Sequence, residues 1–477
     1  MDLQNPLIDR VAAQIAPLLP AHSSILIGLS GGVDSVVLLH LMHKLAARFS
    51  WQLSALHVHH GISQNANAWS DFCTDLCLRH RIPLRIERVD ITPLRAHGIE
   101  AAARKLRHAA FATQPCDFVA LAHHADDQAE TLLLQLLRGA GVRGASAMPL
   151  LARRAGSPIL LRPLLHCSRQ EILDYASAHD LKWIEDESNA DDNYPRNFLR
   201  HRVLPLLSEK FPAYRDTLGR SVQHFAEASK LLDELAQQDA VQAIEGETLA
   251  VSALHALSLP RAKNLLRYFL HCLGAPMPPT VQLDAMLHQL CGAREDAAVC
   301  IAYGGCDTLL RSSRWREQLP AAPPAPEGSA PPCRGGYWQV RRYQGRVYVL
   351  RALAEFDRSL VLPWHGEVEL DWPALNTRLH FKHTRGSGIS HAKLQRALVT
   401  LRMRRGGETL RPHANSASRT LKNLLQEHHI PPWQRDRVPL LYCGDELVCV
   451  PDVAIATEYQ AVADEAGVQL AYELKLK

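Results

Sequence analysis

The expected fold is decided by the stretch ILIGLSGGVDSVVLLHL, residues 25–41. Its first residues form a short apolar run that predicts a buried strand, and the apolar spacing after residue 33 predicts a helix. Two adjacent glycines between them let the backbone turn tightly, and the helix N-terminus adds positive partial charge. The loop is therefore expected to bind phosphate through Ser30, Gly31, Gly32, Val33, Asp34 and Ser35. An ordinary glycine-rich turn is the alternative.

The same alternation of strands and helices continues to about residue 210. Short apolar runs stand at 53–60, 83–90, 117–124 and 159–165, with helical patterns between them. Such alternation predicts βαβ units and hence a parallel sheet with helices on both faces. Because ligands bind at the carboxyl ends of the strands in such sheets, we expect the chemistry directly after GLS, HVHH and LAHH.

The length of the chain, 477 residues, suggests further domains after the first, which is expected to span residues 1–215. Residues 216–318 predict a mostly helical middle domain, and the Pro/Ala-rich residues 319–335 predict a linker. Residues 336–477 predict a C-terminal region that opens with a strand pair turning near Gln344 and Gly345. This region is expected to contain a small mixed α/β domain with its core at about 396–470. The expected fold class is α/β.

Bulk composition excludes several classes of protein. The chain is 47% hydrophobic and 21% charged, which is typical of a globular protein. Its 11 cysteines are odd in number and none forms C-x-x-C, which favours reduced thiols. The sequence has neither a signal-peptide pattern nor 18 consecutive apolar residues, so we expect a cytoplasmic protein outside the membrane. Nothing in the composition specifies an oligomeric state.

Positive charge is concentrated in residues 381–437. This segment has 12 Lys and Arg against 3 Asp and Glu, a net charge of +9 in a chain of net +4, which leaves −5 for the rest. Basicity gathered in one segment indicates a polyanionic partner, with a solvated basic surface as the alternative.

Acidic residues are clustered in LAHHADDQAETLLL, residues 121–134. Asp126 and Asp127 open a predicted helix, and Glu130 shares its first turn. Acids at this position also stabilise a helix by themselves. Beyond a strand end, however, they are typical of a wall that binds a cation. A zinc hydrolase would instead use His123, His124 and Asp127, but it would leave the loop at 30–35 unexplained.

Three further stretches supply candidate ligand-binding residues. His57 and His59 share one face of a predicted strand, although each also suits a polar strand end. Arg104 lies on one helical face with two other charged residues, where surface ion pairing is the alternative. Pro195 suits a helix start. The residues that follow it are Arg196, Asn197, Arg200 and Arg202.

SGGVDS resembles the pyrophosphate loop of the ATP pyrophosphatase (PP-loop) superfamily, whose members cleave ATP between its α and β phosphates. Within it, residues 25–35, 121–141, 183–207 and 401–442 resemble the lysidine synthases. The resemblance implies that Asp34 and Asp127 bind Mg²⁺ and that His59 borders the adenine of ATP. The catalytic residues it implies are Asp34, Asp127, Glu130, Arg104, Asn197 and Arg200.

The resemblance also implies a reaction. Free lysine is joined to C2 of the wobble cytidine in the CAU anticodon of isoleucine tRNA, and ATP becomes AMP and pyrophosphate through an adenylated cytidine. Glu130 would hold the lysine ammonium or accept its proton, and the sequence leaves both roles open. The alternatives are another PP-loop tRNA-modifying enzyme, a synthetase that adenylates a small molecule, and a non-catalytic RNA-binding protein. Intact acids at 34, 127 and 130 argue against the last.

Overall fold

A computed structural model describes residues 6–61, 63, 65–90, 99–153, 156–185, 191–294, 297, 299–304, 337–352, 356–375, 377–414 and 417–474. The chain divides into two compact units, Met1–Leu232 and Asp233–Lys477. Within the described residues, no helix has the length and apolar character needed to span a membrane.

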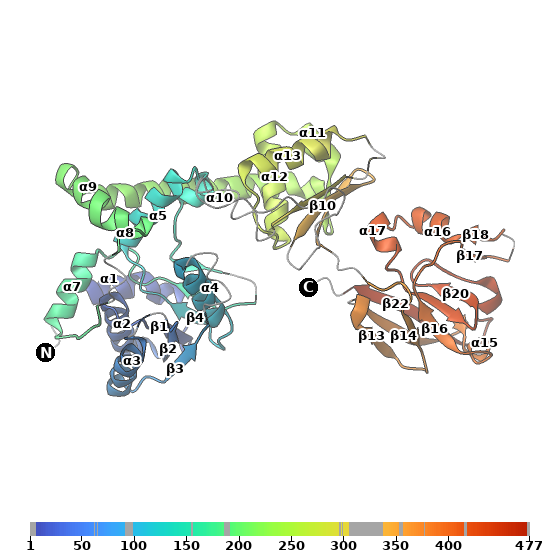
Figure 1. The fold of residues 1–477 in the computed structure, drawn as a ribbon, viewed down its shortest axis with the longest axis horizontal. Coiled ribbons are helices and arrows are strands. Elements are labelled where there is room, and N and C mark those ends of the chain that lie inside the picture. Colours follow the sequence, from blue (N-terminus) through green and yellow to red (C-terminus); the bar gives the residue numbers. More distant parts are fainter. Residues whose placement is uncertain are drawn as a thin grey trace, which may run out of the picture. The chain divides into compact units, whose positions relative to one another are not determined.

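The first unit is built on a six-stranded sheet of order β3-β2-β1-β4-β6-β5 (Figure 1). Its strands are β1 (Ser24–Gly28), β2 (Gln52–His59), β3 (Leu84–Arg88), β4 (Phe118–Ala120), β5 (Leu151–Ala152) and β6 (Ile159–Leu161). The first four and β6 pair in parallel, which confirms the predicted parallel sheet. The edge strand β5 was not predicted, and it pairs antiparallel with β6.

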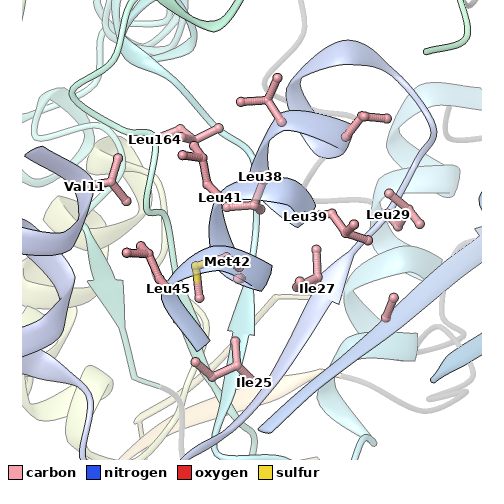
Figure 2. Close-up of a cluster of buried hydrophobic side chains, with 14 of the residues drawn as sticks. Val11, Ile25, Ile27, Leu29, Leu38, Leu39, Leu41, Met42, Leu45 and Leu164 are labelled. Atoms are coloured by element: carbon pink, nitrogen blue, oxygen red, sulfur yellow. The ribbon is translucent and has the colours of Figure 1, made fainter. Parts of the chain in front are cut away.

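Helices cover both faces of this sheet, because successive apolar residues of a strand point to opposite faces and both faces must be buried. Ile25 and Ile27 of β1 pack with α1, α2, α3 and α7, whereas Leu26 faces the other way and packs with α4. Figure 2 shows Ile25 and Ile27 beside the apolar side chains of α2. Between residues 6 and 178, the described helices are α1 (Pro6–Ile15), η1 (Ala16–Leu18), α2 (Val33–Phe49), α3 (Ala66–His80), α4 (Ile99–Ala112), α5 (Ala125–Leu137), α6 (Val142–Ala145) and α7 (Arg169–Ala178).

A second group of helices packs on α5. It consists of α8 (Pro195–Phe198), the π-helical turn η4 (Leu199–Val203), α9 (Leu204–Lys210) and the first part of α10 (Tyr214–Ala243). Ala129 of α5 contacts Leu204 and Tyr214, and Leu132 of α5 contacts Val222. These contacts hold the basic α8–η4 segment beside the acidic start of α5.

The second unit begins with a helical layer on a five-stranded sheet of order β7-β8-β11-β10-β9. The predicted hairpin turns at Gln344 and Gly345, and Tyr343 pairs with Arg346. Within this hairpin, β11 pairs with β8 and β10 pairs with β9. The hairpin was expected to belong to the C-terminal region, but it completes the sheet of the middle region. The predicted linker at 319–335 lies outside the described residues. The elements here are β7 (Ile244–Glu245), β8 (Thr248–Ala250), α11 (Val251–Ala256), α12 (Leu259–Cys272), α13 (Thr280–Gly292), β9 (Val299–Tyr303), β10 (Trp338–Tyr343) and β11 (Arg346–Arg351).

The described residues from 356 onward form a domain of mixed α/β class, as predicted, and its buried apolar core includes residues from Trp364 to Leu470. Two antiparallel sheets, β12-β16-β19-β20-β21 and β13-β14-β22-β15, enclose buried side chains such as Trp364, Phe381 and Leu441. The strands are β12 (Val361–Pro363), β13 (Glu369–Trp372), β14 (Thr377–Arg385), β15 (Ile389–Ser390), β16 (Val399–Arg402), β17 (Thr409–Leu410), β18 (Arg419–Thr420), β19 (Leu440–Cys443), β20 (Glu446–Val450), β21 (Ala454–Ile455) and β22 (Ala466–Leu474). The helices are η6 (Pro373–Leu375), α15 (His391–Leu394), α16 (Leu421–Glu427), α17 (Pro432–Arg435) and η7 (Thr457–Tyr459).

Candidate active site

The glycine-rich loop lies between β1 and α2, at the carboxyl end of the sheet. Gly31 has a φ of 92°, and a Cβ there would lie 2.9 Å from Cδ1 of Ile184, so only glycine fits. Ser35 is buried inside the loop: its Oγ accepts hydrogen bonds from the backbone N–H groups of Ser30 and Gly31 at 3.2 and 3.1 Å. The Ser35 hydroxyl also donates to the Gly32 carbonyl at 2.9 Å. Ser35 therefore shapes the loop from within.

Asp34 and Asp127 meet at the side chain of His124. Nε2 of His124 lies 3.8 Å from Oδ1 of Asp34 and 3.5 Å from Oδ2 of Asp127. Oδ1 of Asp34 is buried and has no hydrogen-bond partner. Burial raises the pKa of Asp34, because desolvation disfavours the charged carboxylate. A carboxylate oxygen without a hydrogen bond, next to the glycine-rich loop, is a place where a cation fits.

Two arginines form ion pairs with Asp127 and Glu130. Nη2 of Arg196 donates to Oδ1 of Asp127 at 2.7 Å, and its Nε donates to Oε2 of Glu130 at 2.6 Å. Arg200 donates to both oxygens of Glu130, at 2.7 and 3.0 Å, and its Nη2 lies 3.3 Å from Oδ1 of Asp127. Burial pushes the pKa of Asp127 up, but His124 and Arg196 outweigh it and hold that pKa below its usual value. Glu130 is fully buried, so this is a desolvated network of ion pairs.

Arg196 is the member of this network that the sequence analysis did not select. It appeared only as one of several basic residues after Pro195. Its spacing of four residues from Arg200 was the available signal, because residues at i and i+4 share one side of a helix.

Asp126, the third acid of the cluster, has a different environment. Its carboxylate accepts a hydrogen bond from the backbone N–H of Arg169 at 2.9 Å and another from Nε of Arg215. It thereby joins the starts of α5, α7 and α10. A cavity of about 560 Å³ lies beside the network. Its wall includes Asp126, Glu130, Arg169, Arg200, Tyr214 and Arg215.

The two histidines of β2 point toward α3. Nδ1 of His57 lies 2.9 Å from the Leu29 carbonyl and 3.6 Å from the Cys73 sulfur, and Nε2 of His59 lies 3.2 Å from Oδ1 of Asn67. Both side chains are buried. The predicted shared face is confirmed, and the contact of His59 with adenine stays a prediction.

The remaining candidates lie on α4 and α8. Arg104 is exposed, and its charge reaches His123 after β4. Asn197 on α8 donates to the Asp191 carbonyl at 2.9 Å. Both lie within the first unit with the acids, and their roles toward a ligand stay predictions.

The alternative zinc site finds no support in the described residues. Nδ1 of His123 accepts a hydrogen bond from Nε of Arg162 at 3.3 Å, so this nitrogen is not open to a metal. A guanidinium in this position opposes a metal cation. Among the residues that the structure describes, no group of three or more His, Cys, Asp or Glu side chains is arranged to hold a metal.

The chain is similar to known proteins over nearly its whole length. A PP-loop domain model matches residues 4–207, a TilS substrate binding domain model matches 249–319, and a TilS substrate C-terminal domain model matches 399–472. The tRNA(Ile)-lysidine synthase of Nitrosomonas europaea is 40% identical over 473 residues, covering 99% of this chain and 95% of that protein. The chain belongs to the tRNA(Ile)-lysidine synthase family. This confirms the resemblance that the four motifs carry.

A second member of the tRNA(Ile)-lysidine synthase family, from Coxiella burnetii, is 36% identical over 451 residues, covering 94% of this chain and 93% of that protein. Among solved structures, a U34-tRNA thiolase from Methanococcus maripaludis aligns with a TM-score of 0.40 at 19% identity, over 46% of this chain and 78% of that one. As a PP-loop member of this family, the chain is a ligase that uses ATP.

Proposed function

We propose that this enzyme joins free lysine to C2 of the wobble cytidine in the CAU anticodon of isoleucine tRNA. One observation carries the proposal: Asp34 and Asp127 lie together beside a phosphate-binding loop. They do so in a chain that is similar over nearly its whole length to proteins named tRNA(Ile)-lysidine synthase.

In the first step, the C2 carbonyl oxygen of the cytosine attacks the α-phosphate of ATP, and pyrophosphate leaves. The N-terminus of α2, which follows the loop and has no side-chain cap, receives the pyrophosphate, because its first backbone N–H groups and partial positive charge favour an anion. No lysine follows the glycines, unlike in loops that serve γ-phosphate transfer. Asp34 and Asp127 would hold Mg²⁺, which would supply positive charge to offset that of the transferring phosphoryl group. The unpartnered Oδ1 of Asp34 fits this cation.

In the second step, the ε-amine of lysine attacks the adenylated C2, AMP leaves and the amine loses a proton. Both oxygens of Glu130 already accept hydrogen bonds from arginines. Its geometry therefore favours holding Arg196 and Arg200 in place over accepting the proton of lysine. The cavity of about 560 Å³ beside Glu130 has room for the lysine side chain and carries both acids and arginines.

The proposal predicts the products of the reaction. With ATP, lysine and an isoleucine tRNA transcript, the enzyme should release AMP and pyrophosphate and raise the mass of the transcript by that of lysine less one water, because the C2 oxygen leaves with AMP. Chromatography of labelled nucleotide and mass spectrometry of the RNA measure both. Release of ADP as the main product, or modification of a small molecule in place of tRNA, would overturn the assignment.

The proposal also predicts selectivity between tRNAs. Methionine tRNAs can carry the same CAU anticodon, so the enzyme must read a second part of the tRNA. A transcript that combines the isoleucine anticodon loop with a methionine tRNA body serves as the control in the same assay and should gain no lysine. Equal modification of both transcripts would refute reading of a second site.

We propose that the C-terminal domain supplies part of this second contact. Its basic residues divide into two groups. Arg402 donates to the Gly444 carbonyl, Arg435 donates to the Ile430 carbonyl, and Arg437 is buried over the Phe356 ring. These three stabilise the domain. The exposed group, whose side chains can reach RNA phosphates, includes Lys382, Arg396, Arg405 and Lys422.

Replacing Lys382, Arg396 and Lys422 with glutamine should weaken tRNA binding and flatten its dependence on salt. Removing one lysine or arginine from a phosphate should reduce the slope of log affinity against log salt by roughly 0.9, because fewer counterions are released. Filter binding across a salt series measures the slope. The matched control is Arg79→Gln on α3, an exposed base outside the segment. An unchanged slope in the triple variant would assign the basic segment another purpose.

A further inference from the structure

We propose that Arg196 is a displaceable counter-ion for Asp127, which neutralises this carboxylate in the ligand-free enzyme and competes with Mg²⁺ for its Oδ1 atom. The inference rests on the proposed role of Asp127 in binding the metal. Arg196 is then a positioning residue, and its contacts change when the metal binds.

The two oxygens of Asp127 are not equivalent. Oδ2 accepts the backbone N–H of His124 at 3.0 Å, a contact that belongs to the start of α5. Oδ1 faces the arginines and accepts Nη2 of Arg196 at 2.7 Å. A divalent cation at Oδ1 would therefore lie next to a guanidinium. Two cations at one carboxylate oxygen repel each other strongly in a desolvated site, so one of them must withdraw.

The geometry points to Arg196 as the one that withdraws. Arg200 donates mainly to Glu130, and its contact with Asp127 is longer, at 3.3 Å. Arg196 instead divides its hydrogen bonds, with Nη2 on Asp127 and Nε on Glu130 at 2.6 Å. It can release Asp127 and keep Glu130, so the exchange leaves no buried charge without a partner.

The position of Arg196 in the chain suits such a movement. It lies on α8, a helix of four residues that runs directly into the π-helical turn η4. π-Helical turns are rare and occur often at functional sites. The Arg196 side chain is 23% exposed, whereas Glu130 is fully buried. The arginine can thus move toward solvent while Glu130 stays fixed.

Binding of Mn²⁺ alone to the full-length protein, measured by electron paramagnetic resonance, tests this competition. Arg196→Gln should tighten Mn²⁺ binding on the order of tenfold, because a charge-assisted hydrogen bond no longer opposes the metal. Arg202→Gln is the matched control, since Arg202 lies in the same segment but pairs with Asp192. It should leave the affinity unchanged. Arg196→Met, which keeps the apolar stem without the charge, replaces the glutamine variant if that one is unstable.

Measurements on Asp127→Asn, alone and combined with Arg196→Gln, separate this inference from the proposed function. The gain from Arg196→Gln should disappear when Asp127 is asparagine. If Asp127→Asn alone leaves the Mn²⁺ affinity unchanged, Asp127 does not bind metal and the proposed function loses that residue. If Asp127→Asn weakens Mn²⁺ binding but Arg196→Gln does not tighten it, Arg196 only braces the fold and the competition is refuted.

Discussion

Replacing Asp34 with asparagine should slow lysidine formation by about 100-fold or more, because the proposed cation loses a charged ligand at the reacting phosphate. The fold should survive. The two side chains are nearly isosteric, and Oδ1 of Asp34 is buried without a hydrogen-bond partner. The carboxylate thus contributes no hydrogen bond there whose removal would destabilise the protein. Its raised pKa indicates the same, since burial disfavours its charge.

Single-turnover release of AMP measures this effect, and the melting temperature reports on the fold. The matched control is Asp71→Asn, which changes an exposed acid on α3 and should leave the rate unaltered. Near-normal turnover of the Asp34 variant, with an unchanged melting temperature, would show that Asp34 only starts the helix α2.

Glu130→Gln is expected to destabilise the first unit by about 3–5 kcal/mol, the usual effect of removing one partner from a buried ion pair. Glu130 is fully buried and accepts hydrogen bonds from Arg196 and Arg200. Without its charge, the two guanidinium groups share only Asp127 and repel each other across the site. The loss of stability should therefore accompany the loss of activity, in contrast to the Asp34 variant.

Urea unfolding followed by hydrogen exchange in peptides from α5 reports on this unit alone. Glu227→Gln, an exposed acid on α10, is the matched control and should change stability little. If the Glu130 variant keeps the wild-type unfolding free energy, the desolvation cost of these charges already cancels their attraction. The role of Glu130 would then be to position Arg196 and Arg200.

The order of elements in the first unit follows from the sequence because it is a local property. Ile25, Leu26 and Ile27 form a continuous apolar run, and such a run already indicates a strand buried on both faces. The glycines of the loop were informative for the same reason. The φ of 92° at Gly31 is one that few other residues adopt, so a glycine at this position indicates the backbone geometry.

Other features depend on how distant parts of the chain pack. The hairpin β10–β11 was predictable from its own residues, but its pairing with β8 was not, since Arg346 pairs with Ala250 far back in the chain. The sequence likewise includes Ser35 in the loop, but only the structure shows that its hydroxyl accepts hydrogen bonds from the loop backbone. A pattern shows that a side chain is needed at a position, and not which way it turns.

The ion-pair network shows where sequence and structure divide. Neighbouring residues alone establish that acids follow β4 and that bases follow Pro195, because helix starts and charge spacing are local features of the chain. The meeting of Arg196 with Glu130, 66 positions away, is instead a product of the folded state. The packing of α9 and α10 on α5 brings those segments together. The physical reason is that periodicity identifies which face of an element is buried, whereas the partner it is buried against depends on how distant elements pack.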